Sequence, residues 1–102
     1  MKMIWAVVRS SKVEAIARAL KKIGVSGCTV YPVRGYGEAW SLYEPLIHGG
    51  HHKLEVIVKE DQVDEAVEEI TKHASTRREG DGILSVFDLN AVVLLRTKQA
   101  LT

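Results

Sequence analysis

The sequence is poor in the features that support several common classes of small protein. Cysteine occurs once in 102 residues, at Cys28, so no internal disulfide can form and the disulfide-stapled design of small secreted domains is excluded. A free cysteine is usually buried, and Cys28 is expected in the core. No apolar run approaches the roughly 18 residues that a membrane-spanning helix needs. The formal net charge of +1 argues against general attraction to nucleic acid or to an acidic membrane.

The remaining composition is that of one compact globular domain. The chain is 46% hydrophobic and 26% charged, and its length suits a single domain over residues 1–102. The opening MKMIWAVVRS lacks the small-residue cleavage site of a signal peptide, and its apolar run is more typical of a strand. A cytoplasmic protein is the expectation.

The hydrophobic pattern alternates between strands and helices. It predicts a helix over 10–24, opened by a capping box of Ser11 and Glu14 and ended at Gly24, and a second helix over 61–75 with Asp61 as N-cap. The expected strands span 2–9, 27–35, 52–60 and 84–89, with a short apolar extension over 90–97. This order predicts an α+β, ferredoxin-like βαββαβ fold, an antiparallel sheet with two helices on one face.

Residues 36–51 show no clean period and form a connection longer than usual, which is typical of functional loops. Two aromatic residues stand in it, Trp40 and Tyr43. They are either exposed anchors for a partner protein or side chains that fold back onto the body, and the sequence leaves both interpretations open.

Three of the four histidines cluster at the end of this loop, at His48, His51 and His52. With Glu44 or Glu55 they offer ligands that Zn²⁺ or Cu²⁺ accepts. The H-x-x-H-H spacing is not a standard structural zinc pattern, and in a strand His51 and His52 would point to opposite faces. A divalent metal site therefore stands beside a second interpretation, a flexible loop end.

The segment REGDG, residues 78–82, is a candidate anion site. Amide groups at Gly80 and Gly82 can approach a phosphate closely, and Arg77 and Arg78 could add charge. The alternative is a tight turn before the last strand. Further binding candidates are Arg34, Arg96 and Thr29, each of which could equally be an ordinary strand or surface residue. No Ser/His/Asp order, paired carboxylates or Walker-type loop is present, so no enzyme is expected.

In order and spacing, the segments MKMIWAVVR, KVEAIARALKKIGVSGCTVYPVRGYG and EGDGILSVFDLNAVVLLRT resemble the PII signal-transduction proteins. The resemblance covers nearly the whole chain. It implies a homotrimer that binds adenine nucleotides (ATP, ADP or AMP) in the clefts between subunits. It also implies that residues 36–51 are a T-loop that signals to a partner protein, such as a membrane transporter.

The resemblance also implies which residues contact the nucleotide: Thr29, Arg34, Gly35, Tyr36, Gly37, Ile57, Thr76, Arg77, Arg78, Gly80, Asp81, Gly82 and Arg96. Four positions depart from the pattern of members that bind 2-oxoglutarate with Mg-ATP. Ala39 replaces a glutamine, His51 or its neighbour replaces a lysine, and Ile83 and Leu94 replace basic residues. These departures argue against 2-oxoglutarate sensing. They also predict that ADP and AMP bind nearly as well as ATP, because fewer cations meet the phosphates.

A second hypothesis keeps the same general fold and changes the function. The chain would be a metal-binding or metal-tolerance protein, similar to CutA-type proteins or to the PII-like proteins associated with heavy-metal efflux. His48, His51 and His52 would then hold the metal.

Overall fold

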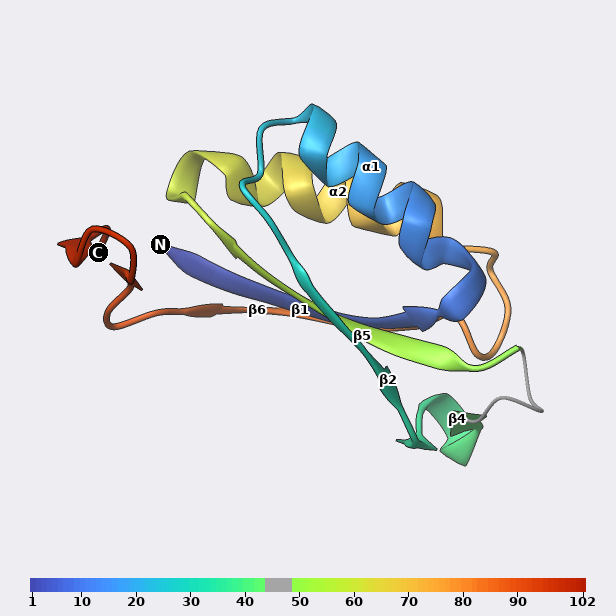
Figure 1. The fold of residues 1–102 in the computed structure, drawn as a ribbon. Helices are drawn as coiled ribbons and strands as arrows, with labels where there is room; N and C mark the ends of the chain where they lie inside the picture. The colour runs from blue at the N-terminus through green and yellow to red at the C-terminus, as the bar shows by residue number, and fades with distance from the viewer. Residues whose placement is uncertain (44–48) are drawn as a thin grey trace.

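In the computed structural model, which describes residues 1–43 and 49–102, two helices cover one face of an antiparallel sheet. The sheet has the order β2-β5-β1-β6, with β1 at Lys2–Arg9, β2 at Thr29–Val33, β5 at His51–Val58 and β6 at Gly82–Asp88. The helices α1 (Val13–Lys22) and α2 (Val63–Ala74) pack side by side (Figure 1). This arrangement confirms the predicted ferredoxin-like fold.

The core lies between the sheet and the helices. Alternation along β1 turns Ile4, Ala6 and Val8 toward the helices, and all three are at most 2% exposed. The apolar stripes of α1 and α2, which contain Ile16 and Ile70, face these β1 side chains. The other core residues are Leu20, Val25, Leu54, Val56, Val58, Ala66 and Ala74.

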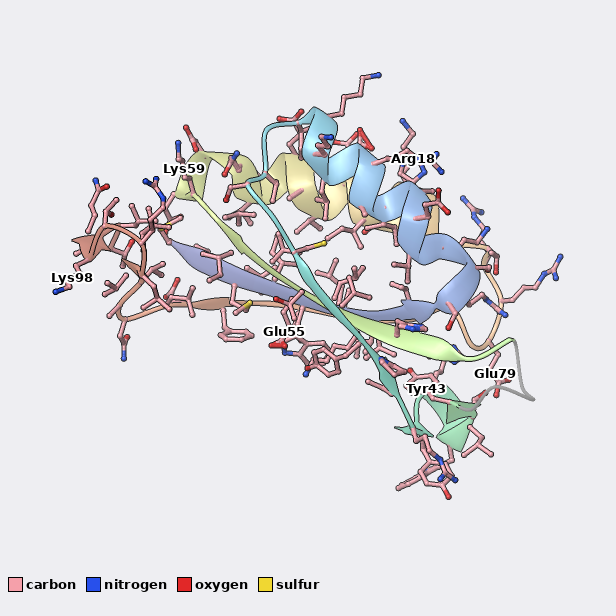
Figure 2. All side chains as sticks on the ribbon, in the orientation of Figure 1. Arg18, Tyr43, Glu55, Lys59, Glu79 and Lys98 are labelled. Atoms are coloured by element: carbon pink, nitrogen blue, oxygen red, sulfur yellow. The ribbon has the colours of Figure 1, made fainter. Side chains whose placement is uncertain are left out.

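The opposite face of the sheet is also apolar, and it is open in the single chain. Ile57, Ile83 and Phe87 are 39%, 59% and 44% exposed. The Lys53 ammonium lies over the Trp5 ring, 4.6 Å from its centroid. Figure 2 shows Glu55 on this side of the sheet, away from the helices. An open apolar sheet face of this kind is typical of a surface that another molecule covers.

The helix starts differ from the predictions. A 3₁₀ turn, Ser10–Lys12, precedes α1, and no side chain caps the helix, so the capping box of Ser11 and Glu14 is wrong. A second 3₁₀ turn, Glu60–Gln62, precedes α2 and makes Gln62 the N-cap residue in place of Asp61. Both helices therefore begin through a tight turn that follows directly from a strand. Within the described residues, no helix has the length and apolar character to cross a membrane.

The strand β2 lies at one edge of the sheet. This position suits Pro32, which has no amide hydrogen to donate to a neighbouring strand. Cys28 lies just before this strand and is exposed, so the expectation that it is buried is wrong for the single chain. The strand is shorter than predicted, and the chain leaves the sheet after Val33.

Two small hairpins project from opposite ends of the sheet (Figure 1). The first, which we call the loop hairpin, spans 35–43 and pairs β3 (Gly35–Tyr36) with β4 (Leu42–Tyr43). The second pairs β7 (Val93–Leu94) with β8 (Gln99–Ala100), near both termini. The first eight residues of the predicted loop 36–51 are therefore ordered.

Candidate functional site

The turn between α2 and β6, residues 75–81, is organised around the carboxylate of Asp81. Thr76 donates its amide to this carboxylate at 2.7 Å and its hydroxyl to the other oxygen. The amide of Arg78 donates at 3.2 Å, and the Nε of Arg9 donates at 3.1 Å from β1. Arg9 also donates to the carbonyl of Glu79 at 2.9 Å, so one guanidinium of β1 holds two residues of the turn.

These contacts control the ionisation of Asp81. Burial alone would raise the pKa of its carboxyl, but the hydrogen bonds from Thr76, Arg78 and Arg9 outweigh burial and hold the pKa well below its ordinary value. The turn therefore contains a permanent negative charge of its own at neutral pH.

This charge revises the predicted anion site. The amides of Thr76 and Arg78 already serve Asp81, and the carbonyl of Gly80 points to a histidine described below. The exposed side chains of Arg77 and Arg78 remain at the surface of the turn. Gly80 and Gly82 have φ of 93° and 104°, which β-carbon-bearing residues rarely adopt. The structure shows the tight turn, and the anion site stays a prediction.

The loop hairpin has a compact tip. The Gly37 amide donates to the carbonyl of Ser41 at 2.8 Å, and the Trp40 amide donates back to the carbonyl of Gly37 at 2.9 Å. The rings of Tyr36 and Trp40 are tilted at a centroid distance of 5.5 Å. Trp40 is nevertheless 79% exposed, so this aromatic side chain is available to another molecule.

Tyr43 takes the opposite orientation. Its side chain is buried, and its ring lies 4.2 Å from the ring of His51, centroid to centroid. A β-carbon on Gly37 would overlap the Tyr43 ring and hydroxyl, so a glycine is needed for Tyr43 to lie there. Figure 2 shows Tyr43 in the hairpin, at the same end of the molecule as Glu79 of the turn. Tyr43 therefore folds back onto the body, whereas Trp40 is exposed and its role as a partner anchor stays a prediction.

His51 joins the hairpin to the turn. It is the first residue of β5, it is 2% exposed, and its Nε2 lies 2.6 Å from the carbonyl oxygen of Gly80. A carbonyl only accepts, so Nε2 carries the proton and donates. Tyr43, His51 and Gly80 form a continuous buried contact from the loop to the turn.

A cavity of about 610 Å³ lies between the loop hairpin and the open face of the sheet. Its walls are formed by Trp5, Val7, Tyr36, Gly37, Glu38, Tyr43, Gly82 and Ile83. Its volume is in the range of small-molecule sites, and its mostly aromatic and aliphatic walls suit a planar ring. Tyr36, Gly37 and Gly82 were predicted from the sequence. Trp5, Val7, Glu38, Tyr43 and Ile83 were not predicted as contact residues. The register of β1 and β6 brings Trp5, Val7 and Ile83 here, and the loop hairpin brings Glu38 and Tyr43.

Other predicted residues lie apart from this cavity. Thr29 and Ile57 lie further along the open face of the sheet, and Arg34 lines a different cavity with Ser10 and His52. Arg96 belongs to the hairpin at the opposite end of the molecule, where Figure 2 shows its neighbour Lys98. A single chain therefore does not bring Arg96 to the other candidates.

The histidines do not converge on a metal site in the described residues. His51 and His52 lie on opposite faces of β5 as predicted: His51 contacts Gly80, and the Nδ1 of His52 lies 2.7 Å from the Ser10 hydroxyl. In the part of the chain that the structure describes, no group of three or more His, Cys, Asp or Glu side chains could hold an ion. His48 and Glu44 lie outside the described residues.

Comparison with known proteins agrees with this fold. The family model of the nitrogen regulatory protein P-II matches residues 1–99. The nitrogen regulatory protein P-II of Pasteurella multocida is 33% identical over 105 residues, which cover 95% of this chain and 93% of the relative. The nitrogen regulatory protein GlnK of Escherichia coli K12 is 32% identical over 108 residues (98% and 96%), and P-II 1 of the same strain is 34% identical over 105 residues (95% and 93%).

The chain therefore belongs to the P-II family. It is a regulatory protein of the P-II type and not an enzyme.

Proposed function

We propose that this chain is a trimeric P-II-type regulator that binds an adenine nucleotide in the cavity between the loop hairpin and the open face of the sheet, beside the turn that precedes β6. The occupied site alters the loop 36–51, which contacts a partner protein, a membrane transporter, from the cytoplasm. The observation that carries this proposal is the shared wall of the cavity, in which Tyr36, Gly37 and Glu38 of the loop face Gly82 and Ile83, the first residues of β6 after the turn. A ligand in this cavity would touch both segments at once.

The trimer accounts for the two features that a single chain leaves unexplained. Neighbouring subunits would cover the open apolar face with Ile57, Ile83 and Phe87. They would also complete the site, since Arg96 lies between β7 and β8, in the hairpin at the far end of its own chain (Figure 1), and could reach the nucleotide only from a neighbour.

A direct route for the signal is the contact from Gly80 through His51 to Tyr43. A phosphate at the turn would contact the backbone near Gly80. The carbonyl of Gly80 accepts a hydrogen bond from His51, and the His51 ring packs on Tyr43 of the hairpin. The exposed Trp40 at the tip supports the output, because a large exposed aromatic side chain is a typical anchor of a protein interface.

Isothermal calorimetry tests the binding step. ADP and AMP are expected to bind nearly as tightly as ATP, because Ile83 and Leu94 supply no cation for the added phosphates. Arg96→Glu is expected to weaken binding at least about tenfold, since losing a charge-assisted phosphate contact costs about 1.5–3 kcal/mol.

The matched control is Arg18→Glu on the exposed side of α1 (Figure 2), which reverses the same charge and should leave binding unchanged. Light scattering of each sample shows whether it remains a trimer. A monomer mass for the native chain, or no heat with any of the three nucleotides, would reject the proposed function.

A further inference from the structure

The cavity between the loop hairpin and the sheet carries one charged side chain, and that charge is negative. Of its eight lining residues, only Glu38 has an acidic or basic side chain, while the others are aromatic, aliphatic or glycine. A site for a polyphosphate would be expected to present cations instead. The described part of this cavity therefore has the wrong charge for a strongly anionic ligand.

The position of Glu38 is set by the backbone of the hairpin tip. Its carbonyl accepts from the amide of Ser41 at 3.0 Å, and the preceding Gly37 is held by the hydrogen bond from its amide to the carbonyl of Ser41. The charge also reaches the interior of the cavity. Burial first, and then the negative charge of Glu38, raise the pKa of the Tyr43 hydroxyl on the cavity wall.

The nearby cations of the same chain are directed elsewhere. Arg9 is engaged by Asp81 and the carbonyl of Glu79, and Arg34 lines the separate cavity near His52. Arg77 and Arg78 are exposed at the turn and are not part of the cavity wall. Lys53 also lies near the wall, with its ammonium 4.6 Å from the centroid of the Trp5 ring. Among the described residues, neither Lys53 nor these four arginines lines the cavity beside Glu38.

We infer that Glu38 is a specificity-determining residue that disfavours each added phosphate of a bound nucleotide, so that the site gains no preference for ATP over AMP. The inference rests on the proposed function and deepens it. A carboxylate beside the phosphates repels a triphosphate more than a monophosphate, because the repulsion grows with the number of negative charges. Ring stacking on Tyr36 or Trp5 is unaffected by this charge, so the base contributes equally for both nucleotides.

The test measures the ratio of ATP to AMP affinity in native protein and in Glu38→Gln, with divalent cations chelated. The glutamine keeps the shape of the side chain and removes its charge. We expect the ratio to shift toward ATP by at least about threefold, and the shift to shrink in 1 M salt, where the screening length is only about 3 Å. Glu65→Gln on the exposed side of α2 removes the same charge far from the cavity and should leave the ratio unchanged.

A ligand-free measurement accompanies the calorimetry. Ultraviolet titration of the phenolate, assigned by Tyr43→Phe, should show a lower pKa for Tyr43 in Glu38→Gln than in native protein. An unchanged ATP-to-AMP ratio would overturn the inference while leaving the proposed function standing if the native chain binds either nucleotide. An equal change for both nucleotides would also overturn it, because it would indicate altered hairpin structure. Absence of binding in every variant would overturn both the inference and the proposed function.

Discussion

Gly82→Ala is expected to destabilise the protein by more than about 3 kcal/mol, the largest effect that we expect of any single methyl group in this chain. Gly82 begins β6 with φ of 104°, and a β-carbon there would overlap the carbonyl oxygen of Val7 on the adjacent β1. The overlap is with backbone, so no side-chain rotation relieves it, and β6 would have to separate from β1. Urea unfolding followed by circular dichroism measures the loss, at fixed protein concentration because the proposed trimer would make stability depend on concentration.

Gly27→Ala is the matched control. Nothing lies within 4 Å of a β-carbon at Gly27, and its φ is not in the positive range. This variant should unfold within about 0.5 kcal/mol of the native chain, as is usual for surface substitutions. Equal stabilities of the two variants would show that the start of β6 does not pack against β1 as described.

The second large effect is expected for Asp81→Asn, which should lower stability by about 2–4 kcal/mol at pH 7. The asparagine cannot accept every hydrogen bond that the carboxylate receives from Thr76, Arg78 and Arg9, and it leaves the largely buried guanidinium of Arg9 without its counter-charge. Unfolding free energies of native protein and variant, measured from pH 7 down to pH 2, give both the size of the loss and its dependence on pH.

The direction of the pH dependence follows from the lowered pKa of Asp81. Because the folded state keeps this carboxyl ionised below its ordinary pKa of 3.8, its stabilisation is fully present above about pH 5 and is lost as pH falls below that value. The stability gap between native protein and Asp81→Asn should therefore narrow in acid. Asp88→Asn, which removes an exposed ion pair with Lys2, should show almost no change at pH 7. A constant gap across the whole range would contradict the role assigned to Asp81.

The layers of the fold could be predicted because the hydrophobic residues of each helix and strand repeat with the period of that element. The stripe containing Ile16 and Leu20 and the alternation of Leu54, Val56 and Val58 needed only local sequence, and both proved to face one core. The helix starts were missed because a 3₁₀ turn and a capping box use similar residues. The predicted burial of Cys28 was wrong because cysteine is usually buried on average, whereas this residue precedes β2, a strand at the edge of the sheet.

The site was only partly predictable. The glycines around Tyr36 and at Gly82 mark the site in the sequence. A β-carbon at Gly37 or Gly82 would overlap neighbouring atoms, so both positions need glycine. The pairing of Arg9 with Asp81 joins residues 72 positions apart and leaves no local signal. Nor could the sequence say which loop aromatic turns inward, because that depends on the space that Gly37 leaves for Tyr43 and on the ring of His51.

The most direct test of the account is hydrogen exchange across the loop hairpin and the turn, with and without ADP. We expect amides of 76–82 and of 35–43 to exchange more slowly together when nucleotide is bound, while those of α1 are unchanged. In His51→Phe, which keeps a ring on Tyr43 but removes the hydrogen bond to Gly80, the turn should still respond and the hairpin should respond less. Bound nucleotide with no change in either segment, or protection gained with zinc and not with nucleotide, would contradict the claim that this chain senses a nucleotide and reports it through its loop.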